Sequence, residues 1–163
     1  MHRYLIPDER VRSIYDIQLD RLKEKGIYSL IIDLDNTLTA WNSPEVSPAL
    51  RQWVKRAKSE GFKICLLSNN GEKRVEKYAK ELDIIPIWKA GKPGRRGFRK
   101  ALEHLGCKEE DCAVIGDQIF TDMIGGNRVG LYTILVTPIA RKEFIGTRLV
   151  RLLEGIVLKR LGD

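Results

Sequence analysis

Short hydrophobic runs recur along this chain, and each one ends in polar or glycine-rich residues. The runs lie at residues 29–33, 62–68, 84–87, 113–117 and 131–136. Their hydrophobic residues are consecutive and do not alternate with polar ones, which is typical of strands buried on both faces of a parallel sheet. We therefore expect about five parallel strands.

Helical patterns separate these strands. The first follows Ser47-Pro48, an N-cap residue and a first-turn proline, and ends at Gly61. Apolar residues at helical spacing stand at Leu50, Trp53, Val54 and Ala57, at Val75, Tyr78, Ala79 and Leu82, and within residues 97–105. Strands that alternate with helices build βαβ units, so the sequence predicts an α/β, Rossmann-like fold with helices on both faces of the sheet.

The length of 163 residues suits a single domain, 1–163. We expect its core at about residues 27–137, an N-terminal extension at 1–26 and a basic amphipathic helix at about 141–162. The N-terminus lacks the apolar segment of a secretory signal, and no apolar stretch approaches the ~20 residues that span a bilayer. An odd number of cysteines favours a reducing compartment. These features predict a cytoplasmic protein.

Polar residues gather where the predicted strands end. They are Asp33 and Asp35 after the first strand, Ser68 and Asn69 after the second, and Asp117 after the fourth. Open parallel sheets bind ligands at the edge formed by the carboxyl ends of their strands. We therefore expect these distant residues to converge on one site.

The placement of Asp33 and Asp35 admits two interpretations. A carboxylate at the rim of a buried sheet is costly without a partner, and a divalent cation is a common solution. A turn after Asp33 would then bring both carboxylates to one phosphate. Alternatively, Asp35-Asn36-Thr37 caps a helix or forms an Asx-turn.

The other polar positions have ordinary interpretations when each is taken alone. Ser68 can end a strand, and Lys92 can be an exposed loop lysine. Asp117 and Asp122 can cap a glycine-rich turn. Their occurrence together, in this order and on the correct strand ends, favours a shared catalytic site.

The set resembles the four motifs of the haloacid dehalogenase-like superfamily. The matching residues are Asp33-x-Asp35-x-Thr37-Leu38, Ser68, Lys92-Pro93 and Gly116-Asp117-x4-Asp122. The resemblance covers about residues 27–137 and implies a Rossmann-like sheet whose first and fourth strands are adjacent. It also implies a phosphatase, because phosphatases and phosphomutases of this superfamily carry Asp at the position of Asp35.

By this resemblance, Asp33 attacks phosphorus and forms an aspartyl-phosphate. Asp35 protonates the leaving alcohol and then takes a proton from the water that hydrolyses the intermediate. Ser68 and Lys92 bind the phosphoryl oxygens, where charge develops in the transition state.

The resemblance also implies a magnesium site. Asp33, the backbone carbonyl of Asp35, and Asp117 would hold the ion beside substrate and water. Asp122 would act through water or orient Lys92. The expected cofactor is therefore Mg²⁺.

Four more residues are assigned to substrate binding. Thr37 and Asn69 belong to the motif segments, and Arg95 and Arg96 follow Lys92 closely. The two arginines would bind a second phosphate, or they form a solvated helix face, as charge runs commonly do.

The spacing of the motifs limits what can cover the site. The intervals from Asp33 to Ser68 and from Ser68 to Lys92 each have room for a helix and a short connection, and neither can hold a large cap domain. We expect an open site that suits a bulky or membrane-presented phosphate ester, unless a neighbouring subunit of an oligomer covers it. With Trp41 after the first motif, the chain resembles the capless subclass IIIA, YqeG-type phosphatases, a group that includes phosphatidylglycerophosphate phosphatases.

The positive charge of the chain indicates which partners to expect. The net charge is +7, and residues 141–163 carry six basic residues beside a helical face formed by Ile145, Leu149, Leu152, Leu153 and Ile156. Such a helix can lie on an anionic membrane, or it packs on the domain with a solvated outer face. We expect a phosphorylated, lipid-borne substrate such as phosphatidylglycerophosphate.

Two alternatives to that function stay open at this point. One is a soluble phosphatase for sugar, nucleotide or polynucleotide phosphates. The other is a non-catalytic protein that binds polyanions. Clustered carboxylates oppose the second, because they repel polyanions, so no nucleic-acid partner is expected.

Overall fold

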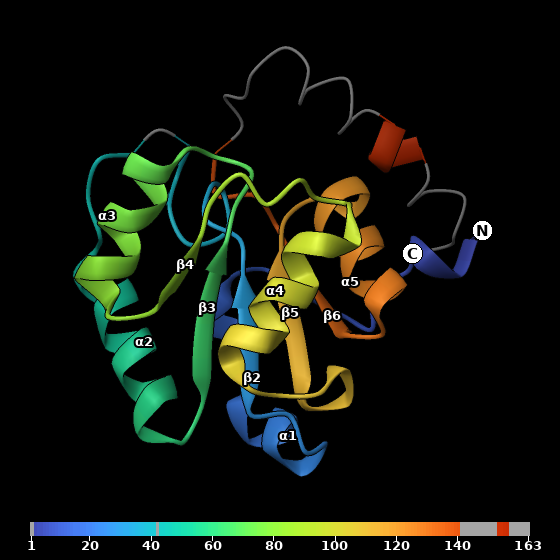
Figure 1. Cartoon of the computed structure of the whole chain (residues 1–163), viewed down its shortest axis with the longest axis horizontal. Coiled ribbons are helices and arrows are strands. Elements are labelled where there is room, and N and C mark those ends of the chain that lie inside the picture. The colour runs from blue at the N-terminus through green and yellow to red at the C-terminus, as the bar shows by residue number, and fades with distance from the viewer. Residues whose placement is uncertain (1, 42, 141–152, 157–163) are drawn as a thin grey trace.

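The computed structural model describes residues 2–41, 43–140 and 153–156. In these residues a parallel six-stranded sheet forms the centre, in the order β1-β6-β5-β2-β3-β4 (Figure 1). The strands are β1 (Glu9–Val11), β2 (Ser29–Ile32), β3 (Lys63–Leu67), β4 (Ile85–Ile87), β5 (Cys112–Gly116) and β6 (Tyr132–Val136). The first and fourth predicted strands, β2 and β5, are neighbours, as expected.

One strand was missed, so the expected number of about five is one too low. Strand β1 lies in the N-terminal extension and pairs with β6, with Glu9 opposite Ile134 and Val11 opposite Val136. Its sequence Glu-Arg-Val contains no hydrophobic run, and Arg10 is exposed while Glu9 and Val11 are only half-buried. The extension therefore completes the sheet.

Helices cover both faces of the sheet. On one face lie α1 (Leu19–Glu24), α2 (Pro48–Ser59) and α3 (Glu72–Leu82), and on the other lie α4 (Arg95–Leu105) and α5 (Ile124–Val129) (Figure 1). Successive residues of β2 point to opposite faces: Leu30 and Ile32 pack with the first group, and Ile31 packs with the second. This two-sided burial explains the consecutive hydrophobic residues in the sequence.

Short turns complete the described chain. They are the 3₁₀ turns η1 (His2–Tyr4), η2 (Ile14–Asp16) and η3 (Glu109–Asp111) and the π-helical turn η4 (Ile119–Met123). Helix α2 begins as predicted, since the Ser47 hydroxyl accepts a hydrogen bond from Leu50 N at 3.2 Å.

The connections at the carboxyl edge of the sheet are loops. Residues 33–41 and 43–47 lead from β2 to α2, and residues 68–71 lead from β3 to α3. In these described residues the chain forms no further layer, so no large cap lies over the edge. No helix in the described ranges has both the length and the apolar character that crossing a membrane requires.

The predicted basic amphipathic helix at 141–162 lies mostly outside the described residues, which here are only 153–156. These four form a helical turn. Its Glu154 is buried and accepts a hydrogen bond from Phe120 N at 3.0 Å, whereas Leu153 and Ile156 are exposed. At this turn the contact with the domain is therefore polar, and the two apolar side chains face away.

Candidate active site

The predicted motif residues converge at the carboxyl edge of the central strands. Asp33 follows β2, and its N–H donates to Ile115 O at 2.9 Å, while the N–H of Ser68 donates to Ile87 O at 3.0 Å. These bonds extend the sheet by one residue and fix both positions. Asp33, Asp35, Ser68 and Lys92 line one cavity of about 340 Å³.

Lys92 forms ion pairs with two carboxylates of the site. Its Nζ lies 2.6 Å from Asp33 Oδ1 and 2.6 Å from Asp122 Oδ1. The Lys92 and Asp122 side chains are only 3% and 1% exposed, so solvent screens these contacts little. This contact places Asp122 where it can orient Lys92, and the alternative that Asp122 acts through water stays a prediction.

Asn69 positions Lys92 through hydrogen bonds to its backbone. Its side-chain oxygen accepts a hydrogen bond from Lys92 N at 2.8 Å, and its amide nitrogen donates to Lys92 O at 3.1 Å. Both amide atoms are therefore occupied by the backbone of one residue. Asn69, predicted to bind substrate, has a positioning contact in addition to its place in the cavity wall.

Burial and neighbouring charges shift the pKa values of Asp33 and Lys92. Burial raises the pKa of Asp33 to about 6, against the opposing effect of the nearby Lys92 ammonium. Burial by itself would lower the pKa of Lys92, but the carboxylates of Asp122 and Asp33 outweigh it and raise that pKa above its usual value. Lys92 therefore stays positively charged, and Asp33 is ionised at neutral pH.

Three of the predicted metal ligands form a cluster suited to a divalent cation. One carboxylate oxygen from each of Asp33, Asp117 and Asp122 lies within 4.8 Å of the other two. Asp117 and Asp122 are buried and Asp33 is half-buried, so the three carboxylates bring negative charge and several oxygen atoms to one point. Oxygen donors with that charge fit a hard divalent ion. The contribution of the Asp35 carbonyl stays a prediction.

Thr37 links two members of this cluster. Its hydroxyl lies 3.3 Å from both Asp33 Oδ2 and Asp117 Oδ1 and can donate its one hydrogen to either. The side chain is buried, so its contacts orient carboxylates. A role in substrate binding, as predicted from the motif, stays a prediction.

A glycine makes room for Asp122. The π-helical turn η4 carries this residue, and its Oδ2 accepts a hydrogen bond from Gln118 N at 3.2 Å. A Cβ atom on Gly116 would lie 2.3 Å from Asp122 Cγ. Any side chain at residue 116 would therefore displace the carboxylate that holds Lys92.

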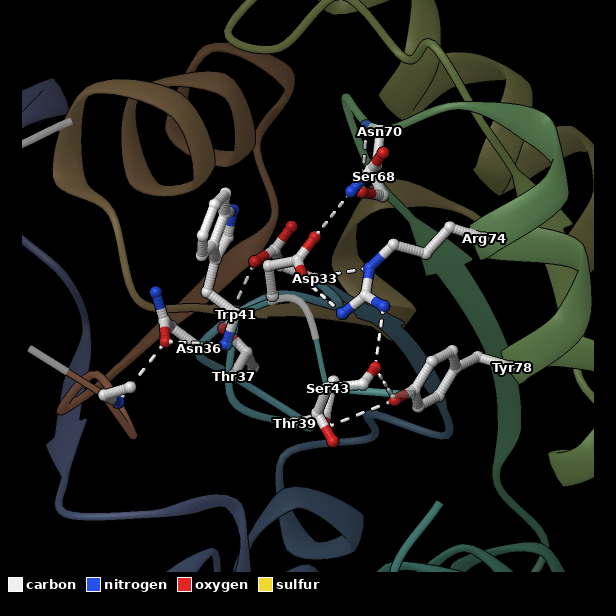
Figure 2. Close-up of polar contacts among 12 residues, drawn as sticks. Asp33, Asn36, Thr37, Thr39, Trp41, Ser43, Ser68, Asn70, Arg74 and Tyr78 are labelled. Carbon is white, nitrogen blue, oxygen red and sulfur yellow. Dashed lines mark hydrogen bonds and ion pairs between the residues drawn. The ribbon is translucent and has the colours of Figure 1, made fainter. Parts of the chain in front are cut away.

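Asp35 does not cap a helix but pairs with Arg74 of α3. Asp35 Oδ1 accepts hydrogen bonds from Arg74 Nε at 3.1 Å and Nη2 at 2.6 Å, and Oδ2 accepts one from Asn70 Nδ2 at 2.9 Å. Figure 2 shows Arg74 and Tyr78 reaching toward Ser43, whose carbonyl accepts a bond from each, at 2.7 and 2.6 Å. Both oxygens of Asp35 are thus occupied in this state.

Sequence reasoning missed Arg74. It lies among the charged residues of the first turns of α3, where its spacing is that of a solvated helix face. No local signal marks its partner, because Asp35 lies 39 residues earlier. Only the packing of α3 beside the loop after β2 brings the two together.

Asn36 organises the mouth of the cavity. Its side-chain oxygen accepts hydrogen bonds from Trp41 N at 3.2 Å (Figure 2) and from Ala140 N at 3.3 Å, and its carbonyl accepts one from Ile139 N at 3.1 Å. Trp41 lines the cavity, and the side chains of Trp41 and Ile139 are both exposed. Trp41 therefore places an exposed aromatic side chain at the cavity.

Arg95 and Arg96 lie outside the active-site cavity. They occupy the first turn of α4, where both are exposed, and neither lines the cavity. The structure does not bring these two predicted substrate-binding residues together with the motif residues.

Comparison with known proteins assigns the class. A family model described as haloacid dehalogenase-like hydrolase matches residues 16–130. The chain belongs to this family, as its motifs predicted, and it is a phosphoric monoester hydrolase.

Two curated proteins that are named as phosphatases are similar to this chain over nearly its whole length. The chain is 42% identical over 161 residues to the "Probable phosphatase YqeG" of Bacillus subtilis (strain 168), covering 99% of this chain and 94% of that protein. It is 32% identical to phosphatidylglycerophosphate phosphatase 1, chloroplastic/mitochondrial, of Arabidopsis thaliana, covering 97% of this chain. The chain spans about half of that relative, 48% of its length.

A solved structure shows the same fold. The 3-deoxy-D-manno-octulosonate 8-phosphate phosphatase from Moraxella catarrhalis aligns with a TM-score of 0.51 at 18% identity. The alignment covers 87% of this chain and 92% of that one. The predicted Rossmann-like architecture is confirmed.

Replacing Arg74 by alanine is expected to lower kcat about tenfold for alkyl phosphates, because Asp35 loses the group that orients its carboxylate. The loss should be smaller for p-nitrophenyl phosphate, whose leaving group needs no proton from an acid. Steady-state rates on both substrates check this difference. Arg74→Lys keeps the charge and should recover part of the rate; equal losses on the two substrates would contradict a role through Asp35.

Proposed function

We propose that this enzyme is a magnesium-dependent phosphatase that works through an aspartyl-phosphate on Asp33 and acts on a phospholipid precursor of the phosphatidylglycerophosphate type. One observation carries the mechanism: the buried contacts of Lys92 with Asp33 and Asp122, beside Asp117, at the base of an open cavity. A nucleophile, a cation and a metal-binding cluster thus meet at one point.

The residues divide the reaction between them. A carboxylate oxygen of Asp33 attacks phosphorus as the bond to the alcohol breaks, and Asp35 gives that alcohol a proton. Asp35 then takes a proton from the water that attacks phosphorus and releases phosphate and free Asp33. Arg74 bonds to Oδ1 of Asp35 and Asn70 makes one bond to Oδ2, so Oδ2 keeps a lone pair that can carry the transferred proton.

Lys92 and Ser68 stabilise the phosphoryl group. The Lys92 ammonium lies against Asp33, where charge on the equatorial oxygens develops. Ser68 accepts a hydrogen bond from Asn70 N at 3.1 Å through its oxygen, which leaves its O–H to donate to a phosphoryl oxygen. Asp33, Asp117 and the backbone carbonyl of Asp35 would hold Mg²⁺, with Asp122 beside them, and the ion would supply further positive charge. The Moraxella catarrhalis structure contains a magnesium and a phosphate ion, which supports this choice of metal.

Three observations support a lipid substrate. The Arabidopsis thaliana relative is named for phosphatidylglycerophosphate, and the cavity here is open. Trp41 lines the cavity with its side chain exposed, and aromatic side chains favour the membrane interface. We infer that the enzyme contacts the membrane peripherally while its substrate stays in the bilayer.

Phosphate release from phosphatidylglycerophosphate in anionic vesicles tests this function. At pH 7.5, above the pKa of about 6 of Asp33, we expect turnover with Mg²⁺ and none with a chelator. Glycerol phosphate and sugar phosphates should react at least about tenfold more slowly in kcat/KM. Equal or faster turnover of the soluble esters would reject the lipid substrate, and full activity with chelator would reject the metal.

A further inference from the structure

A second cavity adjoins the active site on the side of α3. Its volume is about 540 Å³, and its walls include Pro44, Asn70, Lys73, Lys77, Tyr78 and Lys89. We call it the lysine groove. Asn70 lines both cavities, and Arg74, a further wall residue, holds Asp35 of the active site. The groove therefore continues the active site beyond the position of the leaving group.

The groove carries unbalanced positive charge. Within the described residues, none of Lys73, Lys77 and Lys89 forms an ion pair with a carboxylate. Glu72 is the one acidic residue among the described residues of the wall. Arg74 adds little, because Asp35 already balances its charge.

Basic residues of another cavity, on α2, are paired with carboxylates. On α2, Arg51 pairs with Glu81 at 2.7 Å, and Lys58 pairs with Asp83 at 2.8 Å. Salt-bridged cations on those surfaces need no ligand. The lysines of the groove lack that compensation, so an anion would find them available.

Backbone contacts hold two of these lysines at the groove. The Lys77 ammonium donates a hydrogen bond to Pro44 O, a neutral acceptor that leaves its charge uncompensated. Lys89 has φ 46°, in the left-handed region that favours glycine, and its N–H donates to Asn70 O at 2.9 Å. A lysine in a strained conformation, bonded to the residue shared by both cavities, indicates a functional position.

We propose that the lysine groove binds a second anionic group of the substrate, a phosphate located in the alcohol portion that leaves. The inference rests on the proposed function, since it takes Asp33 as the place of the scissile phosphate. A phospholipid precursor with a phosphodiester beside its terminal phosphate has this chemistry, and so does a soluble bisphosphate. The groove selects such esters over those with one phosphate.

Binding to full-length Asp33→Asn protein tests the groove without turnover. The ligands are short-chain monomeric phosphatidylglycerophosphate, glycerol bisphosphate and glycerol phosphate, measured by calorimetry. The variant Lys73→Gln/Lys77→Gln/Lys89→Gln should weaken binding of the first ligand at least about tenfold, as expected for lost contacts to a charged group. Binding of glycerol phosphate should change less than about twofold, and unchanged melting temperatures confirm folding.

A matched control removes equal charge elsewhere. Lys55, Lys80 and Lys100 are exposed and line neither the active-site cavity nor the groove. Their replacement by glutamine should leave all three affinities within about twofold, because distant surface charges are screened. An equal loss in this control would overturn the proposal.

The remaining outcomes separate the possible ligands. Weakening for both two-phosphate ligands assigns the groove to phosphate in general, and weakening for the lipid alone assigns it to the phosphodiester. An equal loss for glycerol phosphate overturns the proposal. A loss of binding to lipid vesicles without a loss for the monomeric ligands also overturns it. So does a loss of affinity that Arg95→Gln/Arg96→Gln causes and the triple lysine variant does not. Absence of phosphatase activity in the unmodified chain would refute the proposed function while leaving these binding constants intact.

Discussion

Replacement of Asp33 by asparagine is expected to lower kcat by about 10⁴-fold or more, as for other residues that form the covalent bond. The amide has no anionic oxygen with which to attack phosphorus, so the aspartyl-phosphate cannot form. Phosphate release from the preferred substrate measures the loss. Labelled phosphate should remain on the unmodified protein after acid quenching and should not appear on the variant.

The fold should survive this substitution. Asparagine removes a carboxylate whose charge burial disfavours, and Lys92 keeps its contact with Asp122. The melting temperature should therefore not fall. The matched control is Asp83→Asn, which removes a carboxylate paired with Lys58 on the surface and should keep full activity. Substantial turnover by Asp33→Asn protein would refute the nucleophile.

Replacement of Lys92 by alanine is expected to damage both stability and activity. It leaves the carboxylates of Asp33 and Asp122 buried without their shared cation, which costs about 3–5 kcal/mol of unfolding free energy. For a chain of this length the melting temperature should fall by about 10 °C. Turnover should fall at least about 10³-fold, because a cation that stabilises the phosphoryl group is lost.

The stability loss should depend on pH. Burial raises the pKa of Asp33 to about 6 even beside the Lys92 ammonium, so without Lys92 the folded chain holds this proton still more tightly than the unfolded chain, and stability falls as pH rises. The deficit in unfolding free energy should therefore be smaller at pH 5 than at pH 7.5. Urea unfolding at both pH values measures it.

Two variants serve as controls for Lys92. Lys58→Ala breaks an exposed pair and should cost less than about 1 kcal/mol. In Lys92→Ala/Asp122→Asn, the removal of one carboxylate should restore part of the lost stability. If Lys92→Ala costs no more than Lys58→Ala, the buried contacts are not energetically important.

Much of the site could be predicted because its signals are local. A polar residue directly after a hydrophobic run lies at the end of a buried strand, and the carboxyl ends of parallel strands share one edge. Asp33, Ser68 and Asp117 could therefore be placed from their positions alone. Strand β1 could not, because its three residues have no hydrophobic run.

The sequence alone determined the parallel α/β fold and the order of the motif residues along the sheet edge, and the resemblance of its motifs to a known family implied Asp33 as nucleophile. These depend on hydrophobic periodicity and short motifs, which each segment expresses by itself. The tertiary structure decided which charged side chains contact each other. It placed Lys92 between Asp33 and Asp122, paired Asp35 with Arg74, and left the lysines of the groove without acidic partners among the described residues. Such pairings join residues distant in sequence, and their energy depends on separation and burial, which no spacing along the chain encodes.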